Sequence, residues 1–284
     1  MSQPDLANVI TFNPWAIAGE TTLTEAARMI ADLDCHHWPV VAENRQLVGI
    51  VSYGDIAQAI EQRLAATAGV AAFDGAYHSA AEEAPRVEEI MTRDVQVVEQ
   101  QQAVSQVLQN MLGRQVHSLP VVSDERLIGM VTSADFLREF SYGDMKCSRD
   151  LVAEHTLRFT EVVDQDASLD EALETLQIHG CECIAVVHGD FPLGAISRTM
   201  VQLAKFQLLV EQLLGSPSVD SPQRVSQLLP DAITIRPGQT LCDLANLLLE
   251  CGQETAAVVQ GRRLVGVISE QSILNAMLTE LMPC

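Results

Sequence analysis

The chain has 284 residues, a formal net charge of −21 at pH 7 and a hydrophobic content of 48%. This length suits one large or two ordinary domains, and the hydrophobic content can fill their cores. The negative charge argues against sequence-independent nucleic-acid binding, which needs clustered lysine and arginine, and against attraction to anionic membranes.

The N-terminal stretch MSQPDLANVITF has no basic segment followed by an apolar one, so we do not expect it to act as a secretory signal. No apolar run approaches the roughly 20 residues needed to span a bilayer. The seven cysteines are scattered along the chain, which fits reduced thiols better than a disulfide scaffold. We therefore expect a cytoplasmic protein with no membrane insertion.

An apolar segment recurs along the chain as HHWPVV, HSLPVV, CECIAVV and QETAAVV. Eighteen residues before the last valine of each segment stands a branched aliphatic residue, and the positions three, four and seven residues later are apolar. The four anchors are Leu23, Val104, Leu169 and Leu241. Because this spacing marks one face of an amphipathic helix, each anchor predicts a helix.

Each copy continues in the same way, with a polar turn, a second apolar strand and a hydroxyl residue that opens another helix. A short extended piece also precedes each predicted helix. The fold class is therefore α/β (α+β), built from tandem β-α-β-β-α units. One hairpin with helices on one side cannot bury both faces, so we expect the units to pair.

The unit resembles the cystathionine-β-synthase (CBS) domain family. The shared motifs are the PVV strand, the polar turn and G-h-h-[ST]-x-x-[DN], where h is apolar. The last motif stands at Gly49–Asp55 and Gly129–Asp135. The resemblance implies two Bateman modules, at 1–142 and 151–284. Their CBS units lie at about 8–62, 87–140, 151–214 and 223–284.

The resemblance also implies a function. Many paired CBS units bind adenosine-containing ligands, so we expect a non-catalytic regulatory protein that binds AMP, ADP, ATP or S-adenosylmethionine, with or without Mg²⁺. A partner enzyme or transporter would read the bound state. Modules of this family often stack into dimers through terminal helices, so we expect a homo-oligomer, although core packing is the favoured interpretation of the helices expected at 201–214 and 272–282.

The spacing from hydroxyl to acid has two interpretations. It is a capping pattern, in which the hydroxyl accepts from an early backbone N–H and the acid favours the positive helix end. It also suits a nucleotide, with phosphate at the helix N-terminus and ribose hydroxyls on the carboxylate. The hydroxyl recurs in all four units as Ser52, Thr132, Ser197 and Ser269. The acid occurs only as Asp55 and Asp135, so we assign it to the ligand and the hydroxyl mainly to the fold.

Two further positions, which are equivalent in the four repeats, divide the chain in the same way. His36 and His117 of the first module correspond to Glu182 and Glu254 of the second, and Thr11 and Thr92 correspond to Leu157 and Leu229. In the family, residues at these positions meet base or phosphate, and a glutamate facing a phosphate costs about 1 to 4 kcal/mol at 4 Å. We therefore expect the second module to have lost its sites. The predicted ligand-binding residues are Thr11, His36, Ser52, Asp55, Thr92, His117, Thr132 and Asp135.

Other constellations give no site. Cys35-His36-His37 and Cys181-x-Cys183 lack the second ligand cluster of structural zinc, so we predict no metal and interpret these cysteines as buried hydrophobes. No nucleophile elbow, P-loop or zinc-protease motif is present, so no catalytic residue or catalytic cofactor is predicted. Two alternatives stay open: a ligand-free scaffold or oligomerisation protein, and a small enzyme acting on nucleotides.

Overall fold

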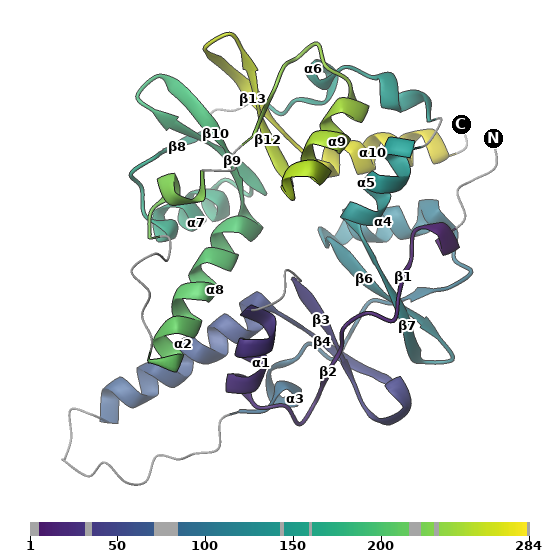
Figure 1. The fold of residues 1–284 in the computed structure, drawn as a ribbon, viewed down its shortest axis with the longest axis vertical. Helices are drawn as coiled ribbons and strands as arrows, with labels where there is room; N and C mark the ends of the chain where they lie inside the picture. Colours follow the sequence, from purple (N-terminus) through teal and green to yellow (C-terminus); the bar gives the residue numbers. More distant parts are fainter. Residues whose placement is uncertain are drawn as a thin grey trace.

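The computed structural model describes residues 6–31, 36–70, 85–142, 145–158, 161–215, 223–229 and 233–282 (Figure 1). Unit 1 consists of β2 (Ile17–Ala18), α1 (Leu23–Ala31), β3 (His37–Val41), β4 (Leu47–Ser52) and α2 (Tyr53–Val70). Unit 2 consists of β5 (Val98–Glu99), α4 (Val104–Arg114), β6 (Ser118–Ser123), β7 (Arg126–Thr132) and α5 (Ser133–Tyr142).

Unit 3 consists of β8 (Val162–Asp164), α7 (Leu169–Ile178), β9 (Cys183–His188), β10 (Phe191–Ser197) and α8 (Arg198–Leu214). Unit 4 consists of β11 (Thr234–Ile235), α9 (Leu241–Cys251), β12 (Thr255–Gln260), β13 (Arg263–Ser269) and α10 (Glu270–Leu281). The predicted β-α-β-β-α order is thus confirmed in every unit. The four anchor residues are the first residues of α1, α4, α7 and α9, and all are buried.

Short elements connect the units. They are η1 (Leu6–Asn8), β1 (Thr11–Phe12), η2 (Glu43–Arg45), α3 (Val87–Ile90), η3 (Lys146–Arg149), α6 (Val152–His155) and η4 (Val225–Leu228). Among the helices of the described residues, none combines the length and the apolar character that a membrane crossing requires.

Consecutive units exchange the segments that precede them. Strand β1, ahead of unit 1, joins the sheet of unit 2 beside β7. Thr92, ahead of unit 2, exchanges backbone hydrogen bonds of 2.9 Å with Ile50 of unit 1. Leu157, ahead of unit 3, is bonded in the same way to Val267 of unit 4. This exchange pairs unit 1 with unit 2 and unit 3 with unit 4.

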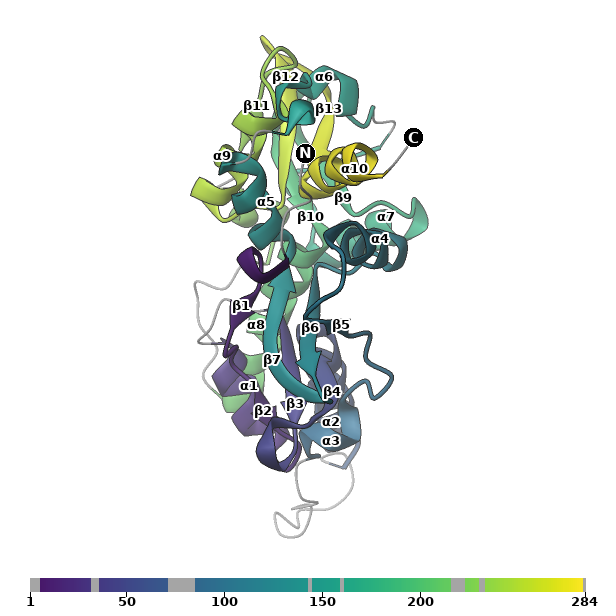
Figure 2. The same ribbon diagram turned by 90° about the vertical axis from the view of Figure 1, so that its right-hand side faces the viewer.

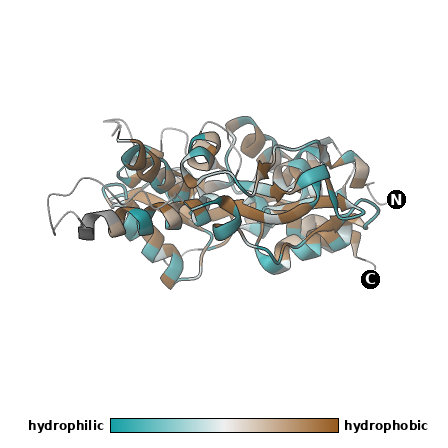
Figure 3. Ribbon diagram, turned by 90° about the horizontal axis from the view of Figure 1, so that it is seen from below, coloured by the Kyte–Doolittle hydropathy of each residue, from teal (hydrophilic) through white to brown (hydrophobic). Residues whose placement is uncertain are grey.

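Helices then join the two pairs. Helix α2 packs against α8, and α10 packs against α4 and α5. The core of unit 1 includes Phe206 and Val210 of α8, while a second core spans units 2 and 4. The four units therefore surround a common centre in a flattened body (Figures 1 and 2). The helices expected at 201–214 and 272–282 are α8 and α10, which thus pack within the chain. Figure 3 shows that apolar strands run through the interior of the molecule.

Candidate functional site

Asp135 lies at the start of α5, where the segment exchanged from unit 1 crosses unit 2. Its Oδ2 accepts from the backbone N and the Oγ1 of Thr132, at 2.9 and 2.7 Å. Its Oδ1 accepts from Thr11 Oγ1 at 3.3 Å and from Arg138 at 2.6 Å. Because a carboxylate has about four acceptor positions, Asp135 is fully engaged by the protein itself.

Asp55 is the equivalent residue in unit 1, but its surroundings differ. Its Oδ2 accepts from the backbone N and the Oγ of Ser52, at 2.8 and 2.7 Å. Among the described residues no donor reaches its Oδ1, and Thr92, the counterpart of Thr11, makes no hydrogen bond to it. Asp55 therefore caps α2 with one oxygen and keeps the other available.

The hydroxyl residue that recurs in all four units, the [ST] of the G-h-h-[ST]-x-x-[DN] motif, acts as a helix cap in three of them. Ser52 Oγ and Thr132 Oγ1 accept from the backbone N of the following aspartates, at 3.3 and 3.2 Å. Ser197 Oγ accepts from the backbone N of Met200 at 3.1 Å. Ser269 makes no such bond. The assignment of this hydroxyl to the fold therefore holds for units 1 to 3.

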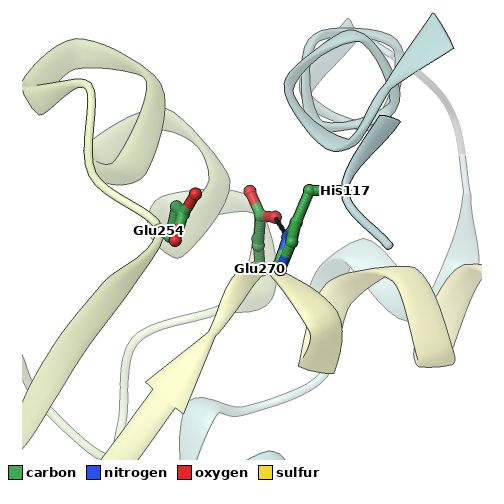
Figure 4. Close-up of side chains that lie close together, drawn as sticks. All are labelled: His117, Glu254 and Glu270. Atoms are coloured by element: carbon green, nitrogen blue, oxygen red, sulfur yellow. Dashed lines mark hydrogen bonds and ion pairs between the residues drawn. The ribbon is translucent and has the colours of Figure 1, made fainter. Parts of the chain in front are cut away.

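Histidine side chains of the first module lie close to glutamate side chains of the second at the centre of the molecule. His36 Nδ1 lies 3.6 Å from Glu254 Oε1, and His117 Nδ1 lies 2.8 Å from Glu270 Oε1 (Figure 4). From the sequence, His36 and His117 are expected in ligand sites of the first module and Glu254 in a lost site of the second, whereas in the structure both histidines face glutamates of the second module. Glu270 was missed, although it follows Ser269 at a position that is not acidic in the other units.

The electrostatics of this centre shift two histidines in opposite directions. Burial alone would lower the pKa of His117, but the hydrogen bond to Glu270 and the charges of Glu254, Glu270 and Glu182 raise it to about 9. Burial, together with the charges of His36 and His117, lowers the pKa of His37 to about 4. At neutral pH, His117 is therefore a cation among carboxylates, while His37 is neutral.

A cavity of about 10 Å³ lies at this centre, about the space of one water molecule. It is lined by His117, Glu182, Ser197, Thr199, Glu254, Thr255, Ser269, Glu270 and Gln271. A cavity of about 350 Å³ lies elsewhere, between α10 and the segment 146–155, and contains none of the predicted ligand residues.

The predicted cysteine roles can be followed in part. Cys183 is buried, and burial raises the pKa of its thiol to about 12, as suits a small hydrophobic residue. Cys181 is partly exposed, and Cys35 lies outside the described residues.

Paired β-α-β-β-α units around a common centre define a tandem-repeat α/β protein. The CBS domain family matches residues 6–62, 87–142 and 225–279, which is more than half of the chain. The chain therefore belongs to the CBS domain family. Unit 3 has the same order of elements as the three matched units, so the chain consists of four tandem CBS units in two Bateman modules.

Two solved structures match almost the whole chain. A Methanocaldococcus jannaschii protein, proposed as an archaeal homolog of g-AMPK, is 19% identical with a TM-score of 0.73, over 96% of this chain and 100% of that one. An uncharacterized conserved protein from Pyrococcus horikoshii is 20% identical with a TM-score of 0.62, over 96% of this chain and 99% of that one. At these identities the likeness shows a shared fold.

Among curated proteins, the L-aspartate semialdehyde sulfurtransferase of Methanocaldococcus jannaschii is 29% identical over 134 residues, which is 47% of this chain and 22% of that protein. The chain spans about a fifth of the length of the first curated relatives it matches.

Proposed function

We propose that this chain is a non-catalytic regulatory protein that binds an adenosine-containing ligand where units 1 and 2 meet. The available Oδ1 of Asp55 carries the proposal, since a carboxylate at a helix start can accept from both ribose hydroxyls. The first backbone N–H groups of α2 suit a phosphate beside it. Membership of the CBS family adds support, because paired CBS units often bind adenosine-containing ligands.

The charge of the centre favours a ligand with few phosphates. Glu182, Glu254 and Glu270 line the central cavity together with His117, and Glu254 also lies 3.6 Å from His36, so these carboxylates are close to the two histidines expected to meet the phosphate. Each carboxylate 4 Å from a phosphate charge costs about 1 to 4 kcal/mol. AMP or S-adenosylmethionine therefore suits this site better than free ATP.

The signal would pass through the contacts between modules. A ligand that joins units 1 and 2 stabilises one relative packing of the modules, and the shift cannot exceed its differential affinity for the two arrangements. The His36–Glu254 contact is one point at which that packing is sensed. A partner enzyme or transporter would bind one arrangement.

The cysteines described in the structure are free thiols, which suits the reducing cytoplasm.

Thermal unfolding with AMP, ADP, ATP, cyclic di-AMP or S-adenosylmethionine, with and without Mg²⁺, tests the site. A ligand at a hundred times its Kd adds about 2.7 kcal/mol of stability. Asp55→Asn should lose most of this shift, because the amide still accepts from Ser52 but presents no charge to ribose. Asp135→Asn is the matched control, and we expect it to keep the shift.

Three results would overturn the proposal. No shift with any of these ligands would favour the ligand-free scaffold. A shift lost in Asp135→Asn but kept in Asp55→Asn would assign the ligand to Asp135 instead. Hydrolysis of a nucleotide by the wild type that persists in both variants would instead favour a small enzyme.

A further inference from the structure

Unit 4 concentrates negative charge at the centre. In each unit, two residues lie close together at the same end of the β-hairpin. One comes just before the first strand of the hairpin, and the other comes just after the hydroxyl residue of the G-h-h-[ST]-x-x-[DN] motif. Units 1, 2 and 3 combine an acid or a histidine there with an aromatic, hydroxyl or basic residue, as in the 3.6 Å ion pair of Glu182 and Arg198. Unit 4 instead places two carboxylates, Glu254 and Glu270, at these positions.

The hairpin of unit 4 holds these two carboxylates together. The backbone N of Glu270 donates to the backbone oxygen of Glu254 at 2.9 Å, at the end of the ladder where Thr255 pairs with Ser269. Glu270 is only 5% exposed. Two acids fixed side by side, one of them buried, require a positive partner.

His117 reaches this pair from unit 2. One donor atom from each of His117, Glu254 and Glu270 lies within 4.8 Å of the other two. Figure 4 shows the imidazole and both carboxylates converging from two different modules. One nitrogen and two oxygen donors therefore point to a common position.

The adjoining cavity offers a further indication of a ligand. Thr255 lines it and is 3% exposed, and its Oγ1 is buried without a hydrogen-bond partner among the described residues. A buried hydroxyl in this state is unfavourable. The cavity, of about 10 Å³, has room for a single water or ion. A water carried by an ion would satisfy this hydroxyl.

We propose that His117, Glu254 and Glu270 bind one divalent first-row transition-metal ion of the zinc class. Three protein ligands, one of them imidazole, and a water in the remaining position are typical of zinc, whereas Mg²⁺ and Ca²⁺ prefer all-oxygen sets. Tetrahedral zinc holds its donors about 3.3 Å apart. The His117–Glu270 pair, now at 2.8 Å, has to open slightly while Glu254 moves inward.

Such an ion would join the two modules, because His117 belongs to the first and both glutamates to the second. It would also hold the two carboxylates of unit 4 in place of the His117 proton, because an imidazole that binds a metal is neutral. Asp55 is not among the three ligands of this ion, and the proposal does not depend on the adenosine-containing ligand.

Metal binding to the full chain, stripped with EDTA and then dialysed, tests this site. Zn²⁺ is titrated against a chelating dye, with no nucleotide present. The wild type should bind one equivalent whose affinity falls more than about tenfold in each of His117→Gln, Glu254→Gln and Glu270→Gln. Excess Mg²⁺ or Ca²⁺ should not displace it.

Two control variants should keep this equivalent. Glu182→Gln alters a carboxylate of the same cavity that pairs with Arg198 instead. His155→Gln removes a member of a second, more exposed group, Asp150, Glu154 and His155, and should affect only ions bound there.

Four outcomes would overturn the proposal. Three concern zinc: none bound by the wild type, affinity unchanged in all three ligand variants, or displacement by Mg²⁺ as easily as by zinc. The fourth is a cobalt–thiolate charge-transfer band with Co²⁺ as a second probe, which would place the ion on cysteines. Circular dichroism checks that each variant is folded. If His117→Gln does not fold, Glu254→Gln decides, because Glu254 has a longer contact, 3.6 Å to His36, and its side chain is 18% exposed.

Discussion

Gly129 lies where the segment exchanged between units comes closest to the hairpin of unit 2. A Cβ there would stand 3.1 Å from the backbone oxygen of Thr11, and a Cβ on Gly49 would stand 3.1 Å from that of Thr92. Backbone atoms held in a sheet cannot move aside as a flexible side chain can. The first glycine of the G-h-h-[ST]-x-x-[DN] motif therefore allows the two units to pair closely.

We expect Gly129→Ala to lower the free energy of unfolding by about 1 to 3 kcal/mol, the usual cost of overpacking. Urea denaturation measures this. Gly113→Ala is the matched control, because a Cβ in that part of α4 would meet nothing within 4 Å. It should raise stability by about 0.5 to 1 kcal/mol, as alanine does inside a helix. Equal effects of the two substitutions would contradict this role of Gly129.

Asp55 and Asp135 show how far a single residue can be read from the sequence. Both stand three residues after a hydroxyl, and both do cap a helix, as the pattern predicts. What distinguishes them is Arg138, one turn after Asp135, where unit 1 has Gln58. That difference is visible in the sequence. The contact of Thr11 with Asp135 is not, because it spans 124 residues and depends on the segment exchange.

At the scale of elements, strand β3 begins at His37, whose Nδ1 is buried. Its pKa of about 4 lies below the ordinary 6.5 because of burial and because of the charges of His36 and His117. Above pH 6.5 the ring is neutral in both the folded and the unfolded chain. Between 6.5 and 4 the unfolded chain binds a proton that the folded chain does not, so stability falls as the pH falls.

We therefore expect wild-type stability to decline by up to about 1.4 kcal/mol per pH unit between pH 6.5 and 5. His37→Gln should flatten this decline, since glutamine does not titrate. Chemical denaturation at several pH values measures both. His188→Gln, at the exposed end of β9, is the control and should keep the wild-type slope. A slope unchanged in His37→Gln would show that other groups cause it.

Helices with an apolar period were predictable as elements, and each anchor residue begins its helix. The short helices η3 and α6 were not predicted, because nothing periodic marks them. Their positions depend on distant residues: the carboxylate of Glu280 accepts from the backbone N of Lys146 and Cys147, at 3.0 and 2.9 Å. Local pattern cannot reveal an element that contacts more than 130 residues away hold in place.

At the scale of the whole molecule, the sequence predicted which units pair along the chain but not how the pairs meet. The repeated apolar pattern predicts which side chains each unit buries in its own core. The contacts of α8 with unit 1, and of His117 with Glu270, depend on how rigid pairs pack together. For the same reason, Glu254, which looked like a lost phosphate ligand, has a partner from the other module in His36, whereas Glu182 pairs with Arg198 of its own unit.

The shared cores predict how the chain unfolds. Phe206 of unit 3 is fully buried in the core of unit 1, with its ring centroid 4.9 Å from that of Tyr53. A second core is common to units 2 and 4. Neither module can unfold without exposing the apolar surface of the other. We therefore expect the wild type to unfold in one calorimetric transition.

Phe206→Ala should remove about 3 to 5 kcal/mol from the contact between α8 and unit 1. If the modules are coupled mainly through this core, the single transition should broaden or divide into two, with unit 1 in the earlier one. Phe191→Ala, at a ring that is 53% exposed in β10, is the control and should leave one transition. Two transitions in the wild type would mean that the modules fold independently. A ligand bound between units 1 and 2 could then stabilise only its own module, since coupling between sites requires an element that both of them bias.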